Sequence, residues 1–216
     1  NPEEQVDVYA QLGDKYYNII VEPQPIYFSL DENLDGAIMN DSDDGSTDDR
    51  GMTTVAYWPP DQVPAGNSWI KIKGRTNGDG EVVRDSCYAL ITDLSRIVNV
   101  DPDPFTLPSG GTAVVDYSVE DANGMPLASG TQVSVSLVGD ADTLASVTTD
   151  FPEGGLNDLT KGIQPGDDFS SLTDYTFTIT RDEGVINNDI DISVKIEVVS
   201  PNGDVTRTVT GTVQSP

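Results

Sequence analysis

The chain of 216 residues carries 37 acidic and 11 basic side chains, one cysteine and no histidine, and its formal net charge is −26. Such a field repels phosphate backbones and anionic lipids, so nucleic acid and bare membranes are poor partners. The lack of histidine removes the commonest general base and zinc ligand, and no apolar stretch reaches the length of a membrane span.

Two short strand-like runs open the chain, at Val6–Ala10 and Tyr17–Val21, and a third follows at Ile26–Leu30. Alternation of apolar and polar residues in each run predicts a strand with one buried face. The first two runs can belong to the sandwich that follows. Alternatively, the arm Asn1–Val21 adds a strand to a neighbouring subunit, as donor strands do in filaments.

The next segment, Asp31–Asp49, contains eight carboxylates and no basic residue. It opens on D-x-N-x-D-G, the start of a calcium-binding loop, with oxygen ligands on alternate residues before a glycine. The candidate Ca²⁺ ligands are Asp31, Asn33, Asp35, Asp41, Asp43 and Asp44. Ser42 stands where an EF-hand has its bidentate Glu, and the loop follows a strand. We therefore expect no EF-hand, and a β-sandwich calcium loop and a solvated acidic loop both remain open.

Two tryptophans lie in the strand-like runs Thr53–Trp58 and Trp69–Lys73. Trp58 and Trp69 can form an aromatic platform for a sugar, although aromatic residues in sandwiches more often pack in the core. The single cysteine, Cys87, cannot form an internal disulfide. Because it lies within an apolar run, we expect it to be a small buried residue.

A proline-rich junction at Asp101–Pro104 is stiff and extended, because each proline restricts itself and its predecessor. We place the domain boundary there, with an N-terminal β-sandwich at 1–99, which includes an acidic insert at 31–50, and a C-terminal domain at 100–216. Period-two runs continue beyond it, and no apolar pattern has helical spacing for three turns. The sequence predicts an all-β chain of two tandem sandwiches.

The second half resembles bacterial immunoglobulin-like domains of the invasin and intimin kind. The resemblance rests on Phe105–Leu107, on Ser109–Val115 and on the turn Asp121-Ala122-Asn123-Gly124-Met125-Pro126, followed by the strand-like Thr131–Leu137. In the first half it covers only about residues 53–98. An internal echo, in which Ile70–Arg84 matches Val194–Arg207 around an Asn-Gly hairpin turn, also indicates two related domains.

The resemblance implies immunoglobulin-like sandwiches on a cell surface that act as spacers, adhesins or filament modules, without shared catalytic residues. We therefore expect an exported, non-enzymatic structural or adhesive protein, stabilised by calcium. Its partners would be other copies of itself, surface proteins or glycans. Two alternatives are a self-assembling, pilus-like filament subunit and a carbohydrate-binding module of a secreted hydrolase.

Overall fold

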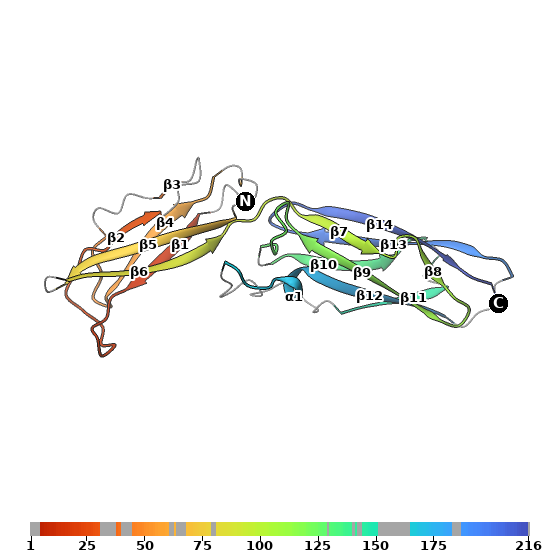
Figure 1. Ribbon diagram of the computed structural model, residues 1–216, viewed down its shortest axis with the longest axis horizontal. Coiled ribbons are helices and arrows are strands. Elements are labelled where there is room, and N and C mark those ends of the chain that lie inside the picture. Colours follow the sequence, from red (N-terminus) through yellow and green to blue (C-terminus); the bar gives the residue numbers. More distant parts are fainter. Residues whose placement is uncertain are drawn as a thin grey trace. The chain divides into compact units, whose positions relative to one another are not determined.

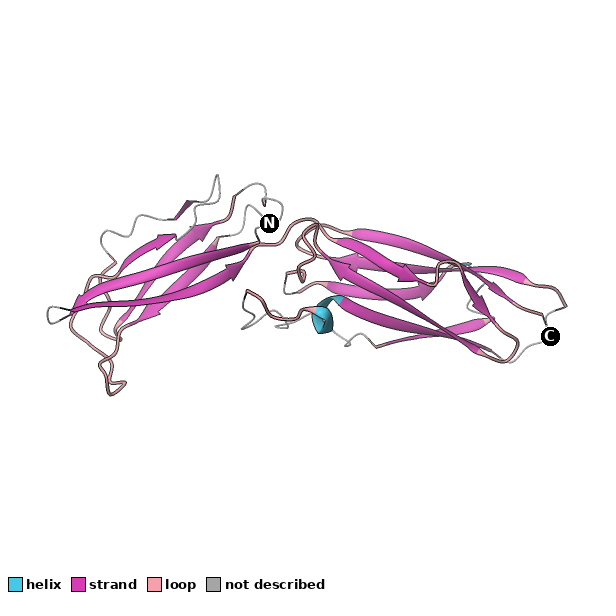
Figure 2. Ribbon diagram, viewed as in Figure 1, coloured by secondary structure: helices cyan, strands magenta, loops and turns pink. Residues whose placement is uncertain are grey.

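The computed structural model describes residues 5–30, 38–39, 45–60, 63, 68–78, 81–128, 130–139, 141, 144–150, 165–182 and 187–215. The chain forms two compact units, Asn1–Ile91 and Thr92–Pro216. Strands dominate both, and the described residues contain one short helix, α1 (Ser170–Thr173) (Figures 1 and 2). The prediction of an all-β chain with two immunoglobulin-like sandwiches is confirmed. No helix among the described residues has the length and apolar character to cross a membrane.

The second unit is a sandwich of two four-stranded sheets (Figure 1). One has the order β11-β12-β9-β7 with antiparallel neighbours, and the other has the order β10-β13-β14-β8, in which β8 runs parallel to β14. The strands are β7 (Arg96–Asp101), β8 (Phe105–Leu107), β9 (Thr112–Glu120), β10 (Gln132–Leu137), β11 (Ala145–Thr149), β12 (Asp174–Arg181), β13 (Ile190–Val199) and β14 (Val205–Val213).

Strict alternation explains why this unit closes around a large core. Along β13, Ile192, Val194 and Ile196 are buried, and the residues between them are more exposed. In the other sheet, β12 buries Phe177 and Ile179 in the same way. Burial of these faces removes apolar surface from water, the main favourable contribution to folding.

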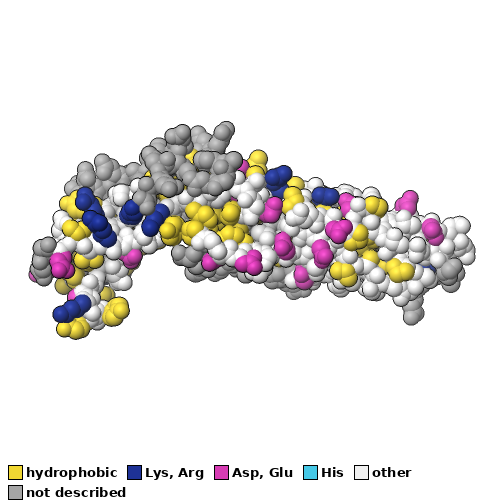
Figure 3. Space-filling view, in the orientation of Figure 1, with side chains coloured by type: hydrophobic (Ala, Val, Ile, Leu, Met, Phe, Trp, Pro, Cys, Tyr) yellow, Lys and Arg dark blue, Asp and Glu magenta, His cyan; other side chains and the backbone are white. Residues whose placement is uncertain are grey.

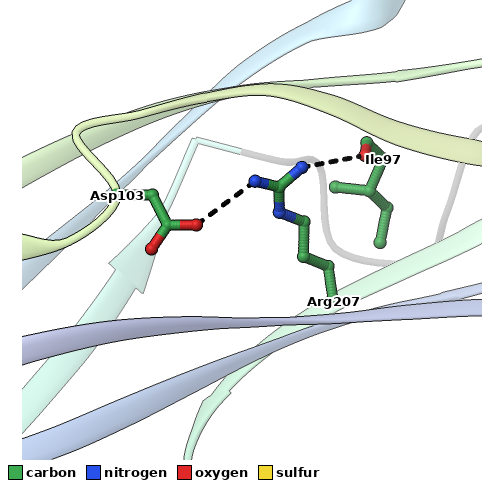
Figure 4. A network of polar contacts seen from close by, with 3 residues as sticks. All are labelled: Ile97, Asp103 and Arg207. Carbon is green, nitrogen blue, oxygen red and sulfur yellow. Dashed lines mark hydrogen bonds and ion pairs between the residues drawn. The ribbon is translucent and has the colours of Figure 1, made fainter.

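The first strand of the second unit is divided between the two sheets. β7 pairs with β9, and β8, which begins at Phe105, pairs with β14 in the other sheet. Asp103, in the crossing segment, accepts a 3.2 Å ion-paired hydrogen bond from Arg207 of β14, and Arg207 also donates to the carbonyl of Ile97 (Figure 4). The Asp101–Pro104 segment, expected to join two domains, thus lies inside the second unit.

The first unit has the same arrangement, but its described residues include no counterpart of the divided strand. Its strands are β1 (Val6–Gln11), β2 (Tyr27–Leu30), β3 (Ile38–Met39), β4 (Met52–Trp58), β5 (Trp69–Gly78) and β6 (Glu81–Leu90). They form two three-stranded sheets, β1-β4-β3 and β2-β5-β6. Among the described residues its buried apolar cluster consists of Tyr57, Ile70, Ile72 and Ile91.

Part of the N-terminal arm is a strand of this sandwich. Residues Val6–Gln11 pair with β4 along their whole length, so this part of the expected donor arm already has a partner within its own unit. The expected strand at Tyr17–Val21 is wrong, because a turn closed by Asp14 holds the chain there and Tyr17 has a φ of 65°. That left-handed conformation is incompatible with a strand.

Candidate functional site

The six candidate calcium ligands, Asp31, Asn33, Asp35, Asp41, Asp43 and Asp44, lie outside the described residues. Calcium binding by this segment therefore stays a prediction. Within the described ranges, no group of three or more Asp, Glu or Cys side chains could hold a metal ion.

The two tryptophans do not share a surface. Trp58 follows the buried Tyr57 on β4 and lies on the outer side of the β1-β4-β3 sheet, whereas Trp69 precedes the buried Ile70 on β5 and lies on the outer side of the other sheet. Side chains of consecutive strand residues point to opposite faces. The structure brings Trp69 together with Tyr88, whose ring centroid is 6.4 Å away at 89°. Trp58 is not part of that pair.

Trp69 belongs to a positively charged surface, which we call the basic face. Because Ile70 and Ile72 are buried, the odd-numbered residues of β5 point outward. The strand register places Arg84 of β6 opposite Arg75. The basic face consists of Tyr27, Trp69, Lys71, Lys73, Arg75, Arg84 and Tyr88.

Cations and aromatic rings are neighbours on the basic face. The Lys71 ammonium lies 5.4 Å from the centre of the Tyr88 ring, and the Arg75 guanidinium lies 5.3 Å from that of Tyr27. These distances are within the range of cation–π attraction. The rings therefore help to hold the two cations in place on the surface.

The basic face gathers four of the chain's eleven Lys and Arg residues on one sheet, and Figure 3 shows dark-blue side chains gathered over the first unit. The carboxylates of β6, Glu81 and Asp85, occupy positions that point to the opposite side of the sheet. At physiological ionic strength the Debye length is about 8 Å. A ligand in contact with this face therefore experiences the local positive charge more strongly than the charge of any acidic residue that lies farther away than this length.

A second exposed surface is the tyrosine loop, residues 12–21. Asp14 organises it, because its Oδ1 accepts N–H groups from Tyr16 and Asn18 at 2.8 and 2.9 Å, and its Oδ2 accepts the Asn18 amide. These hydrogen bonds, led by that of the Asn18 side chain, lower the pKa of Asp14. The loop presents Tyr17 to solvent with 96% of its surface exposed. A pre-ordered tyrosine makes contact area available at little entropic cost.

The expectation that Cys87 is buried is wrong. It is exposed, although it pairs with the buried Ile72 and lies on the inner side of the sheet. The reason is that no described strand covers the inner side of β6. Partial burial, followed by the charge of Asp85, raises the pKa of the Cys87 thiol.

Sequence reasoning missed the basic face, although the signal was present. Lys71, Lys73 and Arg75 alternate with apolar or small residues over only five positions. In a chain with so few basic residues, this period-two alternation predicts a cationic sheet face.

No family of known proteins matches the sequence, and neither does any individual curated protein. Among solved structures, domains 4 and 5 of the S-layer protein SbsC are 17% identical, with 95% of this chain and 80% of that chain covered and a TM-score of 0.35. A titin structure is 6% identical, with 99% and 92% covered and a TM-score of 0.38. The zebrafish RET cadherin-like domains 1 to 4 are 11% identical, with 88% and 41% covered and a TM-score of 0.39.

The chain spans 22% of a longer SbsC structure, which is also 17% identical and has a TM-score of 0.34. All four TM-scores are below 0.5, so these likenesses say nothing about what the chain binds.

Proposed function

We propose that this chain is a non-enzymatic structural and adhesive module of an extracellular surface protein, and that its first unit binds acidic polysaccharide through the basic face. The observation that carries the proposal is the grouping of cations and aromatic rings on β5 and β6. Aromatic rings present an apolar face to sugar rings, while Lys and Arg bind anionic groups. The second unit, with its closed core, serves as a spacer.

The spacing of the charges supports a polymeric ligand. Outward residues of a strand are about 6.8 Å apart, so Lys71, Lys73 and Arg75 form a row of about 14 Å. A linear polyanion lying along β5 contacts all three cations at once. Several weak contacts on one polymer then give useful affinity although each is small.

The test is binding of the 216-residue chain to a polyuronate, with a neutral glucan as the comparison polymer. The variant Lys71→Ser/Arg75→Ser should bind about 3- to 30-fold more weakly, since each exposed ion pair contributes up to about 1 kcal/mol. The matched control is Lys195→Ser, which removes a lysine of β13 that is ion-paired with Glu197. Equal binding by the double variant and the wild type would contradict the proposal.

Trp69→Ala separates sugar recognition from charge alone. Loss of the ring should weaken polyuronate binding without changing its salt dependence, whereas loss of Lys71 and Arg75 should flatten the salt dependence. A synthetic polyanion without sugar rings is the second comparison polymer. If the chain binds it with the same affinity as polyuronate, the basic face would instead be assigned to binding acidic protein surfaces.

Calcium forms a separate part of the proposal. We propose that Asp31, Asn33, Asp35, Asp41, Asp43 and Asp44 bind Ca²⁺ and stabilise the first unit, because their oxygen-rich pattern suits a hard cation. A ligand bound only by the folded state must raise the melting temperature. Both tryptophans belong to the first unit, so their fluorescence should report a higher melting temperature with Ca²⁺ than with chelator. An unchanged melt would refute calcium binding.

A further inference from the structure

An open groove runs between β1 and β6 in the first unit. β1 is the edge of one sheet and β6 is the edge of the other, and no described residue pairs with the outer edge of either strand. On the inner side of β6, Val83 keeps 53% of its surface exposed. The groove therefore combines two unpaired strand edges with an exposed apolar side chain, Val83.

The groove encloses a cavity of about 350 Å³. Val8 and Ala10 of β1 form one wall, and Val83, Asp85 and Cys87 of β6 form the other. Its floor consists of Ile26, Phe28, Ile72, Gly74 and Thr76. Because Gly74 has no side chain, the floor is low at the middle of β5, and the cavity has room for large apolar side chains.

The second unit shows what fills the corresponding position. There β8 runs along the edge of β14, with Phe105 beside Gly211 and Leu107 beside Val213. Phe105 and Leu107 are 2% and 0% exposed, so both enter the core between the sheets. A side chain on Gly211 would collide with the Phe105 ring, which shows that the edge strand is shaped to receive it. The first unit has no described equivalent of β8.

Charge indicates what the outward side of an added strand would carry. A strand beside β6 places its outward side chains next to Arg84, whose cross-strand neighbour is Arg75. Acidic residues on the outward side are therefore complementary to this edge.

We propose that the groove binds an extended strand from another polypeptide, aligned parallel to β6 as β8 is to β14, with large apolar side chains inward and acidic ones outward. The unpaired N–H and C=O groups of β6 provide main-chain hydrogen bonds, and the pockets for alternate side chains provide selectivity. The added strand also protects an edge that is otherwise open to non-specific pairing.

The only cysteine of the chain provides a direct test, because Cys87 lines the groove. The probe is a ten-residue peptide in which Phe, Leu or Val alternates with Asp or Thr. A saturating amount should slow maleimide labelling of Cys87 at least tenfold in the full chain. A peptide of the same composition, with its apolar and acidic residues in two blocks, should leave the labelling rate within twofold of the free protein.

A matched pair of glycine variants tests whether the cavity itself is the site. A Cβ on Gly74 would make ordinary contacts with Ile26 and Phe28, whereas a Cβ on Gly78, on the same strand, meets open space. Gly74→Val should fold and lose protection by the alternating peptide, and Gly78→Val should keep it. Tryptophan fluorescence checks that both variants are folded.

Three outcomes would overturn the proposal. Labelling of Cys87 that the alternating peptide does not slow shows that the groove binds no strand. Equal protection by the blocked peptide, or in Gly74→Val, shows that the groove does not recognise alternation. Protection that develops with protein concentration alone, together with dimers in sedimentation, assigns the groove to a second copy of this chain.

Discussion

The two units share six strands in the same order of pairing, and they differ in how the sandwich is closed. β1 to β6 of the first unit correspond in connectivity to β9 to β14 of the second. Only the second has a described preceding strand, divided into β7 and β8, that covers an edge of each sheet. Among the described residues, the buried apolar cluster has nineteen members in the second unit and four in the first.

This difference shows that alternation alone does not bury a strand. β14 and β6 occupy the same place in the two units, yet Val209 and Val213 of β14 are fully buried whereas Val83 of β6 is exposed. What separates them is β8, which contributes Phe105 and Leu107 from across the edge. We therefore expect the first unit to unfold before the second, because it buries less apolar surface.

The largest expected effect comes from removing the closing strand's anchor. Phe105→Ala should destabilise the second unit by about 3–5 kcal/mol, because it deletes a buried ring and leaves a cavity. Both tryptophans lie in the first unit, so denaturant titration can follow the units separately. The transition seen by circular dichroism should shift to lower denaturant while the tryptophan transition stays in place. A shift of both together would show that the units do not unfold independently.

A smaller effect is expected at a kind of turn that both units use. Asp121 of the second unit is fully buried, and its carboxylate accepts N–H groups from Asp93, Asn123 and Met125 at 2.7–2.9 Å. Asp121→Ala should cost about 2–3 kcal/mol, since hydrogen bonds to a charged group are lost and three partly buried N–H donors lose their acceptor. Thermal unfolding measures this cost, and a loss below that of an exposed Asp→Ala variant would contradict it.

A turn of the same kind in the first unit predicts a pH dependence. Asp48 is exposed, and hydrogen bonds from the N–H groups of Met52 and Arg50 lower its pKa from 3.8. Since the folded-state pKa is depressed, this contribution to stability is present above about pH 3.8 and is lost as the pH falls through the folded-state value. Asp48→Asn should weaken the acid sensitivity of the tryptophan-detected melt. An unchanged acid profile would rule out this role for Asp48.

The chemistry of Cys87 should respond to the open groove. Burial and then the Asp85 carboxylate raise the pKa of its thiol, so the reactive thiolate is scarcer at neutral pH than in a free cysteine. Asp85→Asn should lower the pH midpoint of alkylation and increase its rate near neutral pH several-fold. A midpoint that does not move would show that Asp85 has no influence on the thiol.

The smallest effects are expected at one buried tyrosine in each core. The hydroxyl groups of Tyr57 and Tyr117 are buried without a hydrogen-bond partner among the described residues. Burial raises the pKa of Tyr57 to about 12. Tyr57→Phe and Tyr117→Phe should each lower the free energy of unfolding by less than about 1 kcal/mol or raise it, because no hydrogen bond is lost. A large loss of stability in either variant would reveal a partner for that hydroxyl.

Long strands with strict alternation could be predicted from the sequence, whereas the strands that cover the edges of the sandwich could not. The run Ile190–Val198 predicts β13 almost to the residue, because its period is unbroken over nine positions. β7 and β8 have no such signal, since both are short, two prolines lie between them, and β8 pairs with residues about a hundred positions away. Asn77-Gly78, expected as a hairpin turn, lies instead within the end of β5.

Candidate site residues show the same limit. The basic face could be predicted from the sequence, because Lys71, Lys73 and Arg75 are spaced two residues apart and alternate residues of a strand point to the same side of the sheet. Burial of Cys87 depends on whether another strand lies over β6, which no local pattern can reveal. The calcium candidates between Asp31 and Asp44 stay a prediction, since they lie outside the described residues.

The parallel pairing of β8 with β14 has a mechanical consequence. β8 lies near the start of the second unit and β14 at its end, so tension applied through the two ends of that unit pulls the strands past each other. Their main-chain hydrogen bonds are then loaded together in shear rather than opened one at a time. The described part of the first unit has no such pair. Single-molecule stretching should therefore show the first unit lengthening at low force while the second stays folded, which would make the chain an extensible tether.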